Sequence, residues 1–242
     1  MNPLFPRFGG KSRMVKKLIP MMPEHDTYVE PFAGGASVFF GKPKSKHNVL
    51  NDRDPYIVET LKQGKKMRSC QRMPPSRSAF ERLKRKKRKT LCDKLYVARH
   101  SFNGLGISYR PGSIVSKKPD KYRDQLKGVQ VTNSDYKTVM KRYNRKGTFF
   151  FIDPPYHIPA AKEYYSKTRS EHPHPREVCE CARKSKGKVM ITYNDHPEVR
   201  RACRGLNMKK INVPYSRGTA GAYGKTGKEL IITNYDVRGR RR

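Results

Sequence analysis

The sequence lacks the features of a secreted or membrane-spanning protein. No apolar run approaches the roughly 20 residues that a membrane-spanning helix needs. The N-terminus carries no signal-peptide core, and there is no N-x-S/T glycosylation site. The five cysteines are odd in number and show no paired C-x-x-C spacing, which disfavours a zinc site or a disulfide framework. We therefore expect an intracellular protein whose cysteines are reduced thiols.

Negative charge is also scarce. The chain has 20 Asp+Glu against 55 Lys+Arg, which gives a formal net charge of +35 over 242 residues. A positive field of this size attracts polyanions and produces salt-dependent, sequence-independent binding to nucleic acid. An anionic membrane surface is a much weaker alternative, and a merely solubilising surface does not need so large an excess. We expect nucleic acid to be the partner and a membrane not to be.

What the chain does contain is 35% hydrophobic residues, enough for one sizeable α/β domain. Short β-rich runs end in turn or polar residues, and most are separated by helical stretches. These runs cover residues 26–32, 47–52, 128–135, 147–153, 187–195, 208–215 and 228–235. The alternation predicts a largely parallel sheet with helices on both faces, in which ligands bind at the carboxyl ends of the strands.

One segment, from about residue 67 to residue 124, shows no convincing strand. Ser78 and Glu81 have the spacing of a capping box, which predicts that a helix begins there. The run RLKRKKRK at 82–89 would lie on the exposed face of this helix. A basic helical face is usually just solvated, but within an insertion in an α/β fold, phosphate contact is an equally strong interpretation.

A glycine turn follows the first predicted strand. In VEPFAGGASVFF, residues 29–40, Gly34 and Gly35 let the backbone turn tightly and approach a ligand closely. Alone, such a turn is weak evidence for a cofactor loop. In VLNDRD, Asp52 comes at the end of the next strand, where a carboxylate can accept hydrogen bonds from ribose hydroxyls. Together the two features indicate a cofactor that carries a nucleoside.

The most apolar strand leads into a proline pair. In FFFIDPPYHI, residues 149–158, the apolar half predicts a central strand that is buried on both faces. Pro155 supplies no N–H and holds Pro154 extended, so the Pro154 carbonyl stays available as an acceptor beside the Asp153 carboxylate. Tyr156 adds a flat ring. Two acceptors beside a stacking face suit a planar amino-heterocycle, whereas the simpler interpretation is that the prolines only end a strand.

Seven motifs, in order along nearly the whole chain, carry a resemblance to a known family. They are GGK at 9–11, EPFAGGASVFF at 30–40, LND at 50–52, RHSFNGLG at 99–106, DPPY at 153–156, TYND at 192–195 and KELIITNY at 228–235. DPPY alone is moderately specific, but seven motifs in register make a chance similarity very improbable. With them the chain resembles the D12-class DNA adenine N6-methyltransferases, the Dam-like family.

The resemblance implies a Rossmann-like S-adenosylmethionine-dependent methyltransferase sheet that acts on N6 of a flipped-out adenine. The catalytic motif would be Asp153, Pro154, Pro155 and Tyr156. Asp153 and the Pro154 carbonyl would accept the two N6 hydrogens, with no covalent intermediate, and Tyr156 would stack on the base. The residues implied to bind the cofactor are Phe8, Gly10, Lys11, Pro31, Phe32, Ala33, Gly34, Gly35, Asp52, Asp135 and Asp153.

The family pattern also divides the chain. It implies a catalytic domain of residues 1–63 and 128–242, interrupted by an inserted, basic, mainly helical target-recognition region at 64–127. The residues expected to contact DNA are Arg82, Lys84, Arg85, Lys86, Lys87, Arg88, Arg99, Asn103 and Arg110. The implied partner is double-stranded DNA, in the cytoplasm, a nucleoid, an infected cell or a virion, where other nucleoprotein components would be further partners.

Two segments depart from the family pattern. Family members that recognise the DNA sequence GATC have a basic residue two positions after their Asn-Gly-Leu motif. In this chain Leu105 is followed by Gly106 and Ile107, so the resemblance implies no target sequence. After DPPY, the segment SEHPHPREV at 170–178 replaces a phenylalanine and an Asp-His pair that many relatives have.

Other binding motifs are less convincing. GTAGAYGKTGK at 218–228 lacks the Walker spacing and precedes a strand. Glu171, His172 and His174 are not spaced as ligands on one helix, so we expect no metal.

Three functions therefore stay open. The first is an active DNA adenine methyltransferase. The second is a methyltransferase fold that serves mainly as a basic DNA-binding or genome-packaging protein with weak or no catalysis, which the charge of +35 favours. The third is methylation of RNA or of another amino substrate by the same site. Cofactor binding without methyl transfer would favour the second, and a preference for structured RNA the third.

Overall fold

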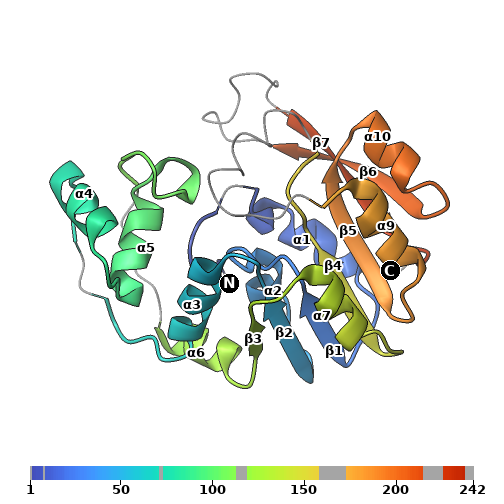
Figure 1. Ribbon diagram of the computed structural model, residues 1–242, viewed down its shortest axis with the longest axis horizontal. Helices are drawn as coiled ribbons and strands as arrows, with labels where there is room; N and C mark the ends of the chain where they lie inside the picture. The colour runs from blue at the N-terminus through green and yellow to red at the C-terminus, as the bar shows by residue number, and fades with distance from the viewer. Residues whose placement is uncertain are drawn as a thin grey trace.

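The computed structural model describes residues 2–7, 9–70, 73–112, 119–157, 173–214 and 226–237. These residues form a seven-stranded sheet in the order β3-β2-β1-β4-β5-β7-β6 (Figure 1). The strands are β1 (Thr27–Glu30), β2 (His47–Asn51), β3 (Gln130–Thr132), β4 (Thr148–Ile152), β5 (Lys188–Asn194), β6 (Asn207–Pro214) and β7 (Thr226–Thr233). β1 to β5 pair in parallel, whereas β7 runs antiparallel to both of its neighbours, β5 and β6.

Helices connect most of the strands. The α-helices in the described ranges are α1 (Val15–Leu18), α2 (Ser37–Gly41), α3 (Pro55–Gly64), α4 (Arg77–Arg85), α5 (Leu91–Arg99), α6 (Pro119–Leu126), α7 (Tyr136–Arg142), α9 (Pro175–Arg183) and α10 (Pro197–Ala202). Three 3-10 turns, η1 (Lys11–Arg13), η2 (Ile19–Met21) and η3 (Phe102–Gly104), accompany them. Within the described ranges, no helix is both long and apolar enough to cross a membrane.

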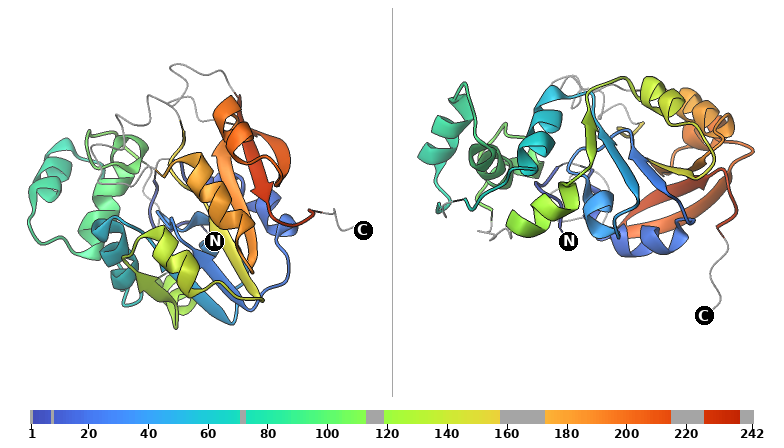
Figure 2. Two further views of the ribbon diagram at one scale, coloured as in Figure 1. Left: turned by 45° about the vertical axis from the view of Figure 1, so that its right-hand side comes forward. Right: turned by 90° about the horizontal axis from the view of Figure 1, so that it is seen from below.

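The core lies in two layers, one on each face of the sheet. Phe149 and Phe151 of β4 pack into a cluster that α1, α2, α3 and α6 complete. Phe150 and Ile152 of the same strand pack into a second cluster with α7, α9 and α10. Seen from below, the sheet lies between these helix layers (Figure 2). Because alternate side chains of a strand point to opposite faces, a strand buried on both faces needs an unbroken apolar run.

The sequence predictions for the sheet are confirmed. Every predicted run overlaps a strand, the sheet is largely parallel, and helices cover both faces. All five residues of β4 are buried, and β4 pairs with β1 and β5 in the middle of the sheet. The apolar run before DPPY is therefore a central strand, as predicted.

The helical segment between α3 and β3 differs in detail from the prediction. The predicted capping box at Ser78 and Glu81 is wrong, because α4 begins two residues earlier: its N-cap is Ser76, whose Oγ accepts from Ala79 N at 3.3 Å. The described capping box in this region belongs to α5, where Thr90 and Asp93 bond reciprocally. In Figure 1, α4 and α5 stand to one side of the sheet. The boundaries 64–127 of a separate region stay a prediction.

The cysteines are not all reduced thiols. Cys70 forms a disulfide with Cys92 of α5, and Cys179 of α9 forms one with Cys203, just after α10. Only Cys181 is free. The expectation failed because pairing depends on packing, which brings each pair of Cα atoms to 5.5 and 5.2 Å, and not on the C-x-x-C spacing that the sequence lacks.

Candidate functional site

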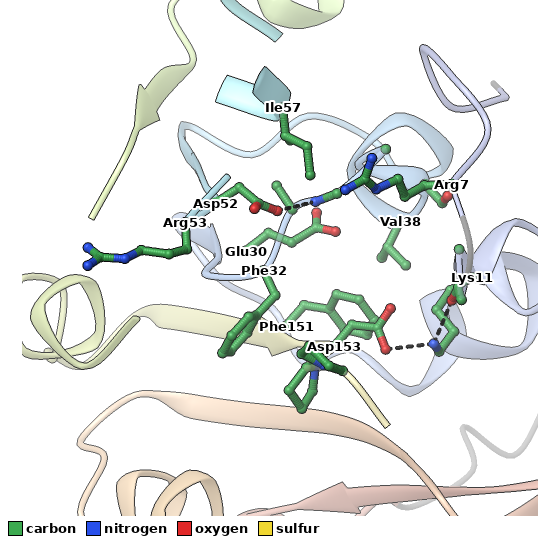
Figure 3. A pocket seen from close by; sticks show the side chains of 18 of the residues that line it. Arg7, Lys11, Glu30, Phe32, Val38, Asp52, Arg53, Ile57, Phe151 and Asp153 are labelled. Carbon is green, nitrogen blue, oxygen red and sulfur yellow. Dashed lines mark hydrogen bonds and ion pairs between the residues drawn. The ribbon is translucent and has the colours of Figure 1, made fainter. Parts of the chain in front are cut away.

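A pocket opens at the carboxyl ends of the parallel strands, where the fold predicts a ligand. It is built from the chain after β1, β2 and β4 and from the N-terminal segment (Figure 3). The lining residues are Arg7, Gly9, Gly10, Lys11, Glu30, Phe32, Ala33, Gly34, Gly35, Ser37, Val38, Asp52, Arg53, Ile57, Phe151, Asp153, Pro154, Pro155 and Tyr156. The glycine turn and the DPPY motif thus meet in one site.

The glycine turn after β1 is fitted closely to its neighbours. Gly34 has a φ of +48°, a conformation that favours glycine, and its N–H donates to Asp52 Oδ2 at 2.8 Å. A Cβ on Gly35 would lie 2.7 Å from the Phe5 carbonyl oxygen, so a side chain there would push the N-terminal segment away. Asp52 Oδ1 accepts from Asp54 N at 2.9 Å, which fixes the second oxygen of this carboxylate.

Asn51 joins the ends of three neighbouring strands. Its Nδ2 donates at 2.9 Å to the carbonyls of Pro31 and Ser134, and its Oδ1 accepts from Thr132 Oγ1 at 2.8 Å. The side chain is 1% exposed. A buried amide that satisfies its bonds in this way holds the loops after β1 and β3 beside β2 and so sets the shape of the pocket beside the glycine turn.

Asp153 is anchored through one oxygen. Lys11 Nζ lies 2.6 Å from Asp153 Oδ1, and Thr192 Oγ1 donates to the same oxygen at 2.6 Å. Lys11 is 3% exposed, so its charge is held inside the protein by this contact and by the Gly9 carbonyl at 2.8 Å. Among the described residues, none bonds to Asp153 Oδ2. That oxygen is left to accept a hydrogen bond from a ligand.

Two contacts hold Tyr156, one at its hydroxyl group and one at its ring. Its hydroxyl donates to Glu229 Oε1, and Lys11 Nζ lies 5.0 Å from its ring centroid. Glu229, on β7, is 2% exposed, and burial raises the pKa of its carboxyl group. Its Oε2 has no hydrogen-bond partner among the described residues. The ring is therefore held in position beside Asp153 and the Pro154 carbonyl.

Two further carboxyl groups in the pocket, those of Glu30 and Asp52, have raised pKa values. Burial raises the pKa of Glu30 to about 8, against a hydrogen bond from Tyr28 Oη at 2.9 Å that favours the ionised form. Burial raises the pKa of Asp52 to about 6, against the bonds from the backbone N–H groups of Asp54 and Gly34. A bound cation or hydrogen-bond donor would therefore stabilise the ionised form of either carboxyl group.

The structure brings most of the predicted cofactor residues together. Gly10, Lys11, Phe32, Ala33, Gly34, Gly35, Asp52 and Asp153 all line the pocket. Pro31 and Asp135 do not: Pro31 is buried, and the Asp135 carboxylate caps α7 by accepting from Lys137 N at 2.7 Å. Phe8 lies outside the described residues. The assignment of each of these residues to the cofactor stays a prediction.

The predicted DNA contacts lie elsewhere, and none lines the pocket. Arg82, Lys84 and Arg85 are on α4, Lys86, Lys87 and Arg88 connect α4 to α5, Arg99 ends α5, Asn103 is in η3, and Arg110 follows η3. Some of them have internal roles. Lys86 Nζ lies 2.7 Å from Asp93, Lys84 Nζ donates to the Ile107 carbonyl at 2.6 Å, and Arg99 is half-buried.

The segment with η3 touches the rim of the pocket. Gly104 has a φ of +73°, and a Cβ there would collide with the carbonyl of Pro6, next to the pocket residue Arg7. This close approach explains the first glycine of the RHSFNGLG motif, Gly104. It also places η3, which follows α4 and α5, in contact with the N-terminal segment of the site.

Sequence reasoning missed several residues of the site. Glu30, Thr192 and Glu229 are polar residues on strands β1, β5 and β7, and they line the pocket or hold its residues. Polar residues at strand ends were expected to matter, so this signal was available for Glu30, the last residue of β1; Thr192 lies two residues before the end of β5. Arg7, which pairs with Asp54 at 3.2 Å, carries no such signal, because the N-terminal segment reaches the pocket only in the folded chain.

Residues 8–216 match the model of the family described as D12 class N6 adenine-specific DNA methyltransferase. A comparison with curated proteins finds no match.

Among solved structures, the chain is similar to precorrin 8W decarboxylase of Methanobacterium thermoautotrophicum (10% identity, 98% and 100% of the two chains, TM-score 0.43). It is also similar to precorrin-6y C5,15-methyltransferase of Geobacter metallireducens (11%, 88% and 82%, 0.42) and to the 23S rRNA methyltransferase ErmE (10%, 97% and 71%, 0.41). The family match covers most of the chain. The chain belongs to the D12 class N6 adenine-specific DNA methyltransferase family.

Proposed function

We propose that this protein transfers a methyl group from S-adenosylmethionine to N6 of an adenine that is flipped out of duplex DNA. The observation that carries the proposal is the arrangement of Asp153. One oxygen is anchored by Lys11 and Thr192, and the other faces the pocket beside the Pro154 carbonyl and the Tyr156 ring. Two acceptors next to an aromatic face match an exocyclic amino group on a planar base.

The pocket residues fit the proposed cofactor. Its lining contains three acidic and three basic residues, namely Glu30, Asp52, Asp153, Arg7, Lys11 and Arg53, although the whole chain has 55 Lys+Arg against 20 Asp+Glu. Buried carboxyl groups with raised pKa values suit a ligand with cationic groups and ribose hydroxyls. Asp52 and the turn at Gly34 would hold the ribose, and Glu30 and Lys11 the methionine end. When bound, the cofactor supplies the electrophilic methyl group.

The protein's own part in the reaction is to position the amino group. Asp153 Oδ2 and the Pro154 carbonyl oxygen would each accept a hydrogen bond from one N–H of the amino group. These two hydrogen bonds would turn the nitrogen lone pair out of conjugation with the ring. Tyr156, fixed by Glu229, would stack on the base. These residues act through orientation and electrostatics that exist before the substrate binds.

DNA is proposed as the substrate because of the family match and the net charge of +35. An adenine inside a duplex cannot present its amino group to a pocket, so the base has to leave the stack. The same charge is the observation that favours the second candidate, a basic DNA-packaging protein with weak or no catalysis. The Asp153 and Tyr156 contacts favour the enzyme.

Nucleoside analysis distinguishes these candidates. The protein would be incubated with S-adenosylmethionine and either unmethylated duplex DNA or structured RNA, and the digested nucleosides analysed by mass spectrometry. We expect N6-methyldeoxyadenosine from DNA and little product from RNA. Tight DNA binding with no methylated nucleoside at any salt concentration would contradict the enzyme and favour packaging, and methylation of RNA in preference to DNA would contradict the DNA substrate.

A further inference from the structure

Three histidines and one glutamate converge just beyond the DPPY motif. His157 directly follows Tyr156, whereas His174 and His196 are the N-caps of α9 and α10. Glu198 lies in the first turn of α10 between two of the imidazoles. His157 Nε2 lies 2.6 Å from Glu198 Oε2, and His174 Nε2 lies 2.9 Å from Glu198 Oε1.

These side chains have the composition and spacing of a metal site. The ligand atoms of His157, His196 and Glu198 all lie within 4.8 Å of one another. Zinc binds imidazole nitrogen and carboxylate oxygen at about 2.0–2.2 Å, so two ligand atoms on one ion lie less than about 4.4 Å apart. Small rotations of the side chains would bring the three groups onto one ion. The His157 and Glu198 side chains are 20% and 35% exposed, which gives an ion access from solvent.

Helix capping alone does not explain this cluster. His174 Nδ1 accepts from Arg176 N at 3.2 Å and His196 Nδ1 from Glu198 N at 3.3 Å, but Ser, Thr, Asp and Asn are the usual N-caps. The chain has 55 Lys+Arg that could pair with a carboxylate, yet Glu198 is paired with two imidazoles, those of His157 and His174. Three rings around one carboxylate therefore need a reason beyond the caps.

The hydrogen bonds decide which residues can be ligands. Binding through Nε2 requires a neutral ring that carries its proton on Nδ1. Among the described residues, no partner of His157 Nδ1 opposes this tautomer. His196 would give up the longer of the two cap bonds. His174 keeps its cap and its contact with Glu198 Oε1, so it acts as a positioning residue that orients the carboxylate.

We propose that His157, His196 and Glu198 bind a divalent transition metal of the zinc type, with His174 orienting Glu198. Imidazole and carboxylate ligands are those that Zn²⁺ accepts, and three protein ligands leave one tetrahedral position for water. The backbone N–H of His157 also donates to Asn194 Oδ1 at 3.1 Å, which holds this residue beside the end of β5. The ion would therefore tie the chain after Tyr156 to the start of α10. This site does not depend on the proposed methyltransferase activity.

Calorimetric titration of the chelator-treated full chain with Zn²⁺ tests the site. Each titration would use the Cys181→Ser background, because the free thiol of Cys181 could also bind the metal. We expect one Zn²⁺ per chain, and affinity at least about tenfold weaker in His157→Ala, His196→Ala and Glu198→Gln. The matched control is His47→Ala, an exposed histidine on β2, which should leave the affinity unchanged.

The positioning role of His174 has its own readout. His174→Ala should weaken Zn²⁺ binding, and His174→Gln, which keeps a donor for Glu198, should restore most of the affinity. Equal affinity in both variants and in the parent chain would contradict this role.

If the variants of His157, His196 and Glu198 fail to fold, a second measurement on the chain without these substitutions still tests the site. Ring nitrogen chemical shifts of the otherwise native chain should show Zn²⁺ at Nε2 of His157 and His196. No binding, binding that survives all three ligand substitutions, or shifts confined to other histidines would overturn the proposal.

Discussion

The two oxygens of Asp153 have different environments, and this asymmetry underlies the proposed chemistry. Oδ1 receives a cation and a hydroxyl, from Lys11 and Thr192, each at 2.6 Å. Oδ2 faces the pocket. A carboxylate held this way cannot rotate without breaking both bonds, so the acceptor for the substrate is in place before the substrate arrives.

Glu30 should make stability depend on pH. An unfolded Glu titrates near 4.5, whereas the folded pKa is about 8, so between these values the folded state holds a proton that the unfolded state has lost. The contribution of Glu30 to stability therefore falls as the pH rises from about 4.5 to 8. Glu30→Gln should remove this slope, with an upper limit of about 5 kcal/mol at 1.36 kcal/mol per pKa unit.

Urea unfolding of both proteins at pH 5, 6.5 and 8 measures this effect. The variant should gain stability relative to the native chain as the pH rises. Burial lowers the pKa of Lys42 to about 8 and the charge of Glu30 opposes that shift, so in the native chain Lys42 affects stability mainly above pH 8. Parallel pH profiles for the two proteins would show that Glu30 is ionised in the folded state.

The Tyr156 ring and its hydroxyl should separate in their effects on base binding. Tyr156→Ala removes the stacking face and should weaken binding of a flipped base by about 1–3 kcal/mol. Tyr156→Phe keeps the ring and removes only the bond to Glu229, so it should retain most of the affinity. Fluorescence of 2-aminopurine at the target position of a duplex reports the extruded base. Equal reductions in affinity for the two variants would argue against stacking.

At the scale of single residues, the sequence predicted Asp153, Pro154, Tyr156 and the glycine turn because their chemistry is written in short motifs. It did not predict Lys11 as the partner of Asp153, nor Glu229 as a site residue, although Glu229 stands in the motif KELIITNY. Glu229 lies on β7 within an apolar strand, and its role appears only when antiparallel pairing brings it to Tyr156. Contacts between distant strands cannot be read from a local pattern.

At the scale of elements, β4 serves both layers of the molecule. Phe149 and Phe151 belong to one core cluster, and Phe151 also lines the pocket, whereas Phe150 lies in the other cluster. Phe150 is opposite Val29 of β1 and Val189 of β5. The strand thus connects the core to the position of Asp153, one residue after its end.

Phe150→Ala should destabilise the protein without changing the pocket directly. Phe150 is fully buried, so the cavity and the forfeited transfer free energy should cost about 3–5 kcal/mol. Denaturant unfolding measures this cost, and Phe102→Ala is the matched control, because Phe102 is 36% exposed. A cost below about 1 kcal/mol for Phe150→Ala would contradict its placement in the core.

Among the elements, strands were easier to predict than helix starts. All seven strands follow from apolar runs of period or length typical of sheets. The start of α4 was misplaced because Ser76 and Ser78 are both acceptable caps, and tertiary contacts choose between them: Tyr96 Oη accepts from Ser76 N at 3.0 Å. The disulfides were missed for the same reason, since packing decides which cysteines meet.

At the scale of the whole molecule, charge is unevenly distributed. The pocket lining has equal numbers of acidic and basic side chains, whereas the chain carries +35. The excess therefore lies on other parts of the protein, including the exposed residues Arg82, Arg85 and Arg88 of α4 and its connection to α5. Such an arrangement separates attraction of the polyanion from chemistry at the base.

Salt dependence of DNA binding tests this separation. If α4 binds phosphates, replacing Arg82, Arg85 and Arg88 by Gln should reduce the slope of log K against log salt by about 0.9 for each phosphate that is no longer neutralised. The matched control replaces the exposed Lys186, Arg201 and Arg204, near α9 and α10, by Gln. Filter binding at several salt concentrations gives both slopes. Equal reductions in the two triple variants would show that DNA does not bind preferentially at α4.

The central claim is that Asp153 Oδ2 orients the amino group, and single-turnover methyl transfer by Asp153→Asn tests it most directly. The Asn oxygen would face the donors Lys11 and Thr192, which leaves its NH₂ to oppose the substrate amino group. We predict a single-turnover rate roughly 10²–10³-fold lower at saturating S-adenosylmethionine. Glu180→Gln, an exposed change on α9, is the control for folding and should transfer at the native rate. Methyl transfer by Asp153→Asn at the native rate would contradict the account.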